Sequence, residues 1–183
     1  MSVLMDRPCT ILPCRRTAQM TTTEELRQQA ADNGAEVIDW KFESDKIKGL
    51  YCDGVIAVNS QIETNAEKAS ILAEELGHHL TASGDILNQK DASNRKQELR
   101  GRIWAYNRLI GLSGIIKAYN AGCRNRYEMA DILQVDEETL QDAIDYYHEK
   151  YGLCVIVDTY IIYFEPLGVL DCTTETEGHD GIF

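Results

Sequence analysis

The chain has 183 residues, of which 44% are hydrophobic and 26% charged, as in an ordinary globular protein. This length predicts one domain, or one domain with a small addition. The 30 acidic and 18 basic residues give a net charge of −12, which excludes a stand-alone nucleic-acid binder and favours a basic protein partner. The sequence has no apolar run near the roughly 20 residues of a membrane span, and its N-terminus lacks signal-peptide features. We therefore expect a cytoplasmic protein that does not bind membranes.

The first third of the chain predicts one helix and a small sheet. Residues 1–20 have no clear period, so we expect an irregular lead-in. A helix should follow, capped by Thr22 or Thr23, because acidic residues then fall in its first turn. The segments 35–40 and 46–59 read as strands, and the Asp-Gly pair within the second is a strong hairpin signal. Together they predict an antiparallel sheet.

The segment 64–83 is the most informative part of the sequence. Thr64 and Glu67 fit a capping box, in which the Thr hydroxyl and the Glu carboxylate each accept a backbone hydrogen bond. Apolar residues then recur at helical spacing, which predicts an amphipathic helix. A Ser-Gly-Asp run at 83–85 should end it, and a second helix is expected over 94–111.

The last third of the chain predicts more helices and a terminal hairpin. A short helix is expected over 113–120, and two helices joined near Val135 over 126–152. The second of these is acidic, which argues against DNA reading by the pair. The apolar runs in 153–167 should pair as a hairpin, and the polar tail that follows should be mobile.

Four side chains on the 64–83 helix suggest metal chemistry: Glu74, Glu75, His78 and His79. Residues four apart on a helix face the same way, so Glu74 lies beside His78. The string is close to H-E-x-x-H, in which two histidines bind zinc and the glutamate is the general base. Here Glu74 takes the first ligand position and Glu75 the general-base position. A carboxylate ligand weakens the metal as a Lewis acid and suits manganese better than an imidazole does.

A hydrolytic zinc site needs three protein ligands and one open position. Glu98 on the next predicted helix is the candidate for the third ligand. The alternative is that this acidic string is only a solvated helix face. Two features favour a metal site: flanking leucines place part of the string near a buried seam, and Gly77 lies inside the helix. Glycine there costs about 1 kcal/mol relative to alanine, which points to a close approach by another backbone or a substrate.

Several longer runs carry a resemblance to a known family. They include GLYCDGVIAVN at 49–59, TNAEKASILAEELGHH at 64–79, QELRGRIWAYNRLI at 97–110 and YIIYFEPLGV at 160–169. Over about residues 22–169 the chain resembles the ImmA/IrrE-type zinc metallopeptidases. Members of that family are typically encoded beside a repressor gene on prophages and integrative elements. Characterised members cleave a helix-turn-helix repressor and so release transcription.

The resemblance implies roles for individual residues. Glu74, His78 and Glu98 would bind one divalent metal, with zinc as the first choice and manganese as the second. Glu74 replaces the first histidine of the family motif, which makes the chain an E-E-x-x-H variant. Glu75 would be the general base, and His79 and Asp85 would be outer partners of the ligands.

The resemblance also implies a fold and a function. The fold would be α+β, with a small zincin-like (gluzincin-type) domain over 21–111 that contains an antiparallel sheet and the active-site helix. A helical addition with a terminal hairpin would occupy 112–169, and a mobile tail 170–183. The chain would be a metalloendopeptidase that cleaves a helix-turn-helix repressor of a phage or mobile element.

Two alternatives remain open. Because Glu74 replaces a histidine, the chain could be a catalytically weakened module that regulates its repressor by binding alone. The second alternative is that the chain is a toxin- or antitoxin-like regulator from a mobile element, which acts through the helices of 126–151.

Overall fold

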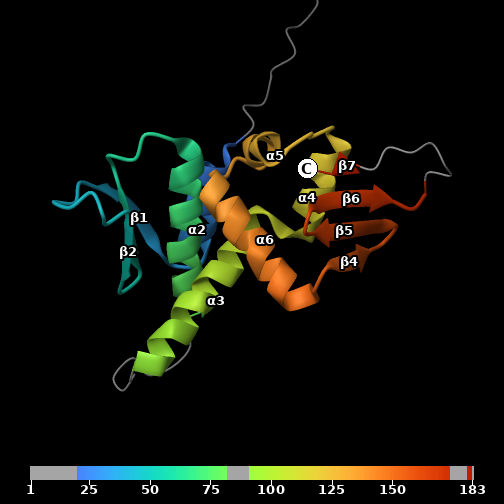
Figure 1. Cartoon of the computed structure of the whole chain (residues 1–183). Helices are drawn as coiled ribbons and strands as arrows, with labels where there is room; N and C mark the ends of the chain where they lie inside the picture. Colours follow the sequence, from blue (N-terminus) through green and yellow to red (C-terminus); the bar gives the residue numbers. More distant parts are fainter. Residues whose placement is uncertain (1–19, 82–90, 174–180, 183) are drawn as a thin grey trace, which may run out of the picture.

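A computed structural model of the chain describes residues 20–81, 91–173 and 181–182 (Figure 1). The predicted lead-in, apart from Met20, lies outside the described residues, and so does Asp85. The fold is α+β, with one three-stranded and one four-stranded sheet. In the part that is described, no helix is long and apolar enough to cross a membrane.

The chain enters the fold through α1 (Thr22–Asp32). The predicted helix is confirmed, but its N-cap is Thr21 and not Thr22 or Thr23. The Thr21 hydroxyl accepts a hydrogen bond from the Glu24 amide at 3.3 Å, and the Glu24 carboxylate accepts one from the Thr21 amide at 2.7 Å. The reason for the correction is spacing, because Glu24 completes a capping box only with the residue three positions before it.

The first sheet contains β1 (Glu36–Trp40), β2 (Gly49–Cys52) and β3 (Val55–Asn59), in the order β1-β3-β2. The β2–β3 hairpin is antiparallel, as predicted, and both residues of its Asp53-Gly54 turn have positive φ. The prediction of a wholly antiparallel sheet is wrong, because β1 pairs with β3 in parallel. The apolar strand β3 lies at the centre of the sheet, with β1 on one side and β2 on the other. β1 runs antiparallel to β2, but the two strands are not neighbours.

Two long helices follow the sheet: α2 (Asn65–Thr81) and α3 (Asp91–Leu109). The Glu67 amide donates to the Thr64 hydroxyl at 3.2 Å, as the capping pattern predicts. The Glu67 carboxylate instead pairs with Lys48 at 2.6 Å. That contact ties the first turn of α2 to the segment that leads into β2.

Three further helices follow: α4 (Gly111–Asn120), α5 (Arg126–Leu133) and α6 (Glu137–Tyr151). The predicted pair within 126–152 is confirmed, with Asp136 as the N-cap of α6 and Gly152 as its C-cap.

The second sheet is antiparallel and contains β4 (Cys154–Val157), β5 (Tyr160–Phe164), β6 (Leu167–Asp171) and β7 (Gly181–Ile182). The predicted terminal hairpin is β4–β5. The strands β6 and β7 were not predicted from the sequence. We expected a mobile tail from residue 170 onward. That segment instead begins inside β6 and includes β7, which pairs with β6.

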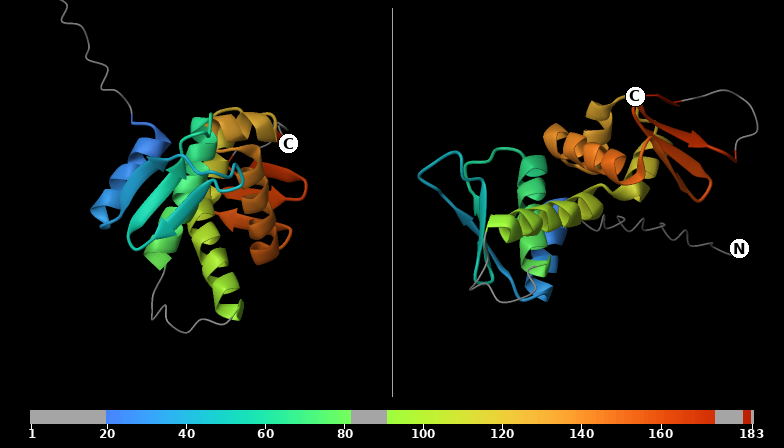
Figure 2. Two further views of the ribbon diagram at one scale, coloured as in Figure 1. Left: turned by 90° about the vertical axis from the view of Figure 1, so that its left-hand side faces the viewer. Right: turned by 60° about the horizontal axis from the view of Figure 1, so that its bottom comes forward.

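The helices lie between the two sheets, which occupy opposite sides of the molecule (Figures 1 and 2). The buried hydrophobic residues form one cluster that runs from Leu26 in α1 to Val169 in β6. Tyr147 of α6 is fully buried within it, and its hydroxyl donates to Asn107 of α3 at 3.2 Å. The core thus joins the segment predicted as the metallopeptidase domain to the helical addition.

Candidate metal centre

The candidate centre lies where α2 and α3 cross at close range. A Cβ atom built on Gly77 of α2 would lie 2.4 Å from the carbonyl oxygen of Gly101 in α3. No side chain fits at that distance, so the two helix backbones are in direct contact. This confirms the expectation that Gly77 admits another backbone, and the backbone is that of α3.

The crossing brings together the three predicted ligands. Glu74 and His78 come from α2 and Glu98 from α3, and one ligand atom of each lies within 4.8 Å of the others. The distance from His78 Nε2 to Glu98 Oε2 is 3.5 Å. Two ligands that are each about 2.1 Å from a tetrahedral zinc ion lie about 3.4 Å apart. The His78–Glu98 distance fits this value, and two carboxylates with one imidazole are suitable ligands for a divalent cation, so the group could hold a metal ion.

His78 is held in place by a second glycine. A Cβ atom on Gly101 would lie 2.6 Å from Nδ1 and Cε1 of the His78 ring. The imidazole therefore packs directly on the α3 backbone, and its side chain is only 13% exposed. Glu98, in contrast, is 60% exposed. The cluster thus has one well-fixed ligand and one ligand that faces solvent.

Glu75 lies on the side of α2 that faces β2. A Cβ atom on Gly49 would lie 3.0 Å from Glu75 Oε1, so the glycine makes room for the carboxyl group. Burial and, to a smaller extent, the negative charges of Glu74 and Glu98 raise the pKa of Glu75 to about 7, against a lowering hydrogen bond with the Tyr51 backbone. A carboxyl group that titrates near neutral pH can both take up and release a proton.

His79 makes contacts on another side of α2. Its Nε2 lies 3.0 Å from the carbonyl oxygen of Asn33, and its Nδ1 lies 3.0 Å from the hydroxyl of Tyr51. A carbonyl oxygen only accepts, so Nε2 carries a proton and donates to Asn33. His79 therefore ties α2 to β2 and to the end of α1. Asp85, the other predicted outer partner, lies outside the described residues.

Arg102 is a part of the centre that sequence reasoning missed. Its Nε donates to Oε1 of Glu74 at 3.1 Å. It follows Glu98 by four residues on α3, so both side chains are on one face of that helix. This spacing is the signal that could have identified it once Glu98 was a candidate ligand.

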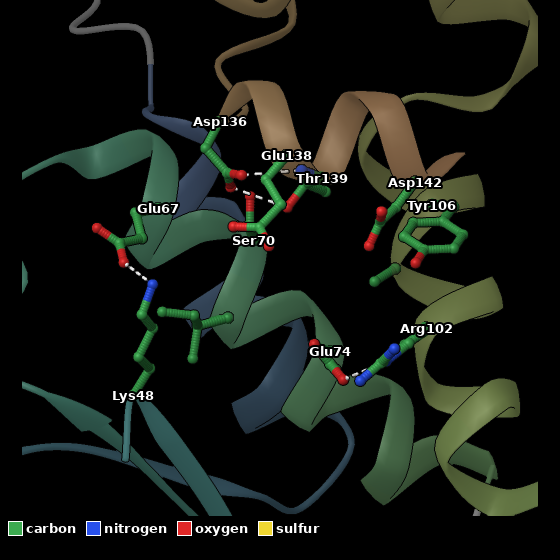
Figure 3. A pocket seen from close by; sticks show the side chains of 12 residues that line it. Lys48, Glu67, Ser70, Glu74, Arg102, Tyr106, Asp136, Glu138, Thr139 and Asp142 are labelled. Atoms are coloured by element: carbon green, nitrogen blue, oxygen red, sulfur yellow. Dashed lines mark hydrogen bonds and ion pairs between the residues drawn. The ribbon is translucent and has the colours of Figure 1, made fainter. Parts of the chain in front are cut away.

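A pocket of about 450 Å³ adjoins the centre and shares Glu74 and Arg102 with it (Figure 3). Its wall also includes Lys48, which is paired with Glu67, and residues from the first turns of α6. Its acidic lining residues outnumber the two basic ones and are Glu67, Glu74, Asp136, Glu138 and Asp142. Because both basic side chains are already paired with carboxylates, the pocket favours a positively charged group.

The sequence matches no protein-family profile, and a search against curated proteins finds no match. The chemistry of the site therefore follows from its geometry. That geometry brings together Glu74, His78 and Glu98, with Glu75 beside them. It does not place His79 among the ligands' hydrogen-bond partners.

Proposed function

We propose that this chain is a metal-dependent endopeptidase whose metal ligands are Glu74, His78 and Glu98. The observation that carries the proposal is the convergence of these three side chains from two helices to within 4.8 Å. The glycine contacts between α2 and α3 support it, because they place His78 and Glu98 at a spacing suitable for a shared ion. Zinc is the expected metal, with manganese as the second choice.

In the proposed mechanism of peptide hydrolysis, the cluster would hold the metal and Glu75 would transfer the proton. A divalent cation held at the cluster would polarise the scissile carbonyl and lower the pKa of a water molecule. Glu75 would take a proton from the attacking water as the new C–O bond forms. It would then give that proton to the amine nitrogen as the C–N bond breaks. Its partly buried position beside the ligands suits this transfer.

The proposed substrate is a helix-turn-helix repressor of a phage or mobile element. This part of the proposal rests on the resemblance to the ImmA/IrrE-type peptidases. It is supported by charge, because DNA-binding proteins carry basic surfaces, while this chain has a net charge of −12 and an acidic pocket beside the cluster.

The test is metal content and cleavage in matched variants. The full chain, purified without added metal or chelator, is compared with His78→Ala, Glu98→Ala and Glu75→Gln by plasma emission. His148→Ala is the histidine control, because His148 lies on α6 and pairs with Glu165 at 3.7 Å. We expect near-stoichiometric metal in the wild type, the control and Glu75→Gln, and loss of metal in the other two.

Cleavage is measured by mass spectrometry on folded helix-turn-helix repressors mixed with each variant. Glu75→Gln should keep the metal and lose cleavage. A Glu75→Gln protein that still cleaves would refute the assigned mechanism.

A second function is favoured by one observation. The ion pair between Glu74 and Arg102 satisfies the Glu74 carboxylate without a metal. The chain would then be a module that controls its repressor by association alone. No bound metal after reconstitution with zinc or manganese, together with repressor binding that Glu75→Gln leaves unchanged, would establish this alternative.

A further inference from the structure

Arg102 stands out among the charged residues around the centre. Of the ion pairs in the described residues, the Arg102–Glu74 pair is the one that joins a lysine or arginine to a candidate ligand. Its Nε donates to Oε1 of Glu74 at 3.1 Å, and Figure 3 shows the two side chains directed toward one another. Arg102 is therefore positioned to affect how Glu74 binds a metal ion.

The pair leaves Glu74 within the cluster. Glu74 makes the hydrogen bond to Arg102 while one of its oxygens remains within 4.8 Å of the ligand atoms of His78 and Glu98. A guanidinium that competed with a cation would be expected to draw the carboxylate away from the other two ligands. Arg102 instead pairs with Glu74 while the carboxylate stays close to the other two candidate ligands.

The hydrogen bond engages Oε1, and no described side chain donates a hydrogen bond to Oε2. A free carboxylate can bind a metal through both oxygens, as it often does with cations that take six or more oxygen ligands. A hydrogen bond from a guanidinium to one oxygen disfavours metal binding through both oxygens, because that oxygen already shares a lone pair with the donor. That arrangement suits the four-coordinate geometry of zinc.

The formal charge of the site with Arg102 present also matches that of a zinc site. In H-E-x-x-H sites the position of Glu74 is a neutral imidazole. The Glu74–Arg102 pair also has no net charge, so the formal charge of the site equals that of a two-histidine, one-glutamate zinc site. Without Arg102, the site would carry one more negative charge than such a zinc site.

We propose that Arg102 is a positioning residue that limits Glu74 to one metal-binding oxygen and so makes the site select zinc over manganese. This inference rests on the proposed function, because it takes Glu74 as a metal ligand. It adds the residue that lets a glutamate replace the first histidine of the motif.

The ratio of zinc to manganese affinity isolates this effect. Both ions carry two positive charges, so loss of the arginine charge shifts both affinities by a similar factor. The number of oxygens that Glu74 offers affects the two ions differently, because they prefer different coordination numbers. A role of Arg102 in folding alone would leave the ratio unchanged.

The experiment is calorimetric titration of the chelator-stripped full chain with zinc chloride and with manganese chloride. Wild type is compared with Arg102→Met and with Arg100→Met, a control that removes a positive charge from an exposed position on the same helix. Residues that orient metal ligands typically contribute about 10–100-fold to metal affinity. We expect the zinc-to-manganese ratio to fall about tenfold in Arg102→Met, the lower end of that range, and to stay near wild type in Arg100→Met.

Cobalt(II) gives a second readout, because four-coordinate cobalt absorbs visible light much more strongly than six-coordinate cobalt. The absorption should weaken in Arg102→Met. Arg102 is 52% exposed, so the variant should fold, and circular dichroism checks this. Arg102→Ala repeats the test if the methionine substitution disturbs the fold.

The outcomes separate the two proposals. An unchanged ratio in Arg102→Met, or an equal fall in Arg100→Met, overturns the role of Arg102 and leaves the metal site standing. A wild-type chain that binds none of the three ions overturns the metal site, and the inference with it.

Discussion

Substitution of Gly77 by alanine is a direct test of the helix contact that builds the centre. Alanine favours a helix interior by about 1 kcal/mol relative to glycine, so propensity alone predicts stabilisation. The new Cβ would lie 2.4 Å from the Gly101 carbonyl oxygen, well inside the 3.0 Å that such contacts respect. The neighbour is backbone and cannot rotate away, so α2 and α3 must separate. Overpacking of this kind costs typically 1–3 kcal/mol. We expect Gly77→Ala to destabilise the fold by about 2 kcal/mol.

The assay is urea unfolding followed by circular dichroism, with Gly114→Ala as the control. Gly114 lies inside α4, and a Cβ there would lie 3.2 Å from a terminal methyl group of Leu133, which can move. The control should therefore stay within about 1 kcal/mol of wild type. Separation of the helices should also weaken zinc binding, because the His78–Glu98 distance of 3.5 Å depends on it. A Gly77→Ala protein as stable as wild type would refute the proposed backbone contact.

Three further predictions test the rest of the fold. Burial raises the pKa of Asp136, but hydrogen bonds with Ser70 and with the first turn of α6 outweigh burial and hold the pKa below its ordinary value. Its contribution to stability is therefore complete above about pH 4 and is lost as the pH falls through the lowered pKa. The stability advantage of wild type over Asp136→Asn should thus shrink between pH 7 and pH 3 in thermal melts, and a constant difference would contradict this. Tyr147→Phe should lower the free energy of unfolding in urea by about 1 kcal/mol, because it removes the hydrogen bond that the buried Tyr147 hydroxyl donates to Asn107. An unchanged free energy of unfolding would show that this hydrogen bond does not stabilise the fold. Leu72→Ala should cost about 2–5 kcal/mol, since Leu72 is fully buried, and a smaller loss would mean that the core collapses around the gap.

Local chemistry accounts for what sequence reasoning predicted correctly. The Asp53-Gly54 turn, the Thr64 cap and the Asp136 cap each depend on residues within a few positions of one another. The placement of Glu74 and His78 on one helix face has the same origin, because helical spacing alone sets it. The N-cap of α1 was the exception, since three adjacent threonines offered equivalent caps and the box with Glu24 selected the first.

The sequence by itself therefore determined the helices, the β2–β3 and β4–β5 hairpins, and three carboxylate and imidazole side chains suited to a metal. Only the tertiary structure decided that β3 lies between β1 and β2, that Gly77 meets Gly101, and that Arg102 pairs with Glu74. It also decided the raised pKa of Glu75, which comes from burial and from neighbouring charges. These features depend on contacts between segments far apart in the chain, and such contacts leave no periodic or local pattern in a single sequence.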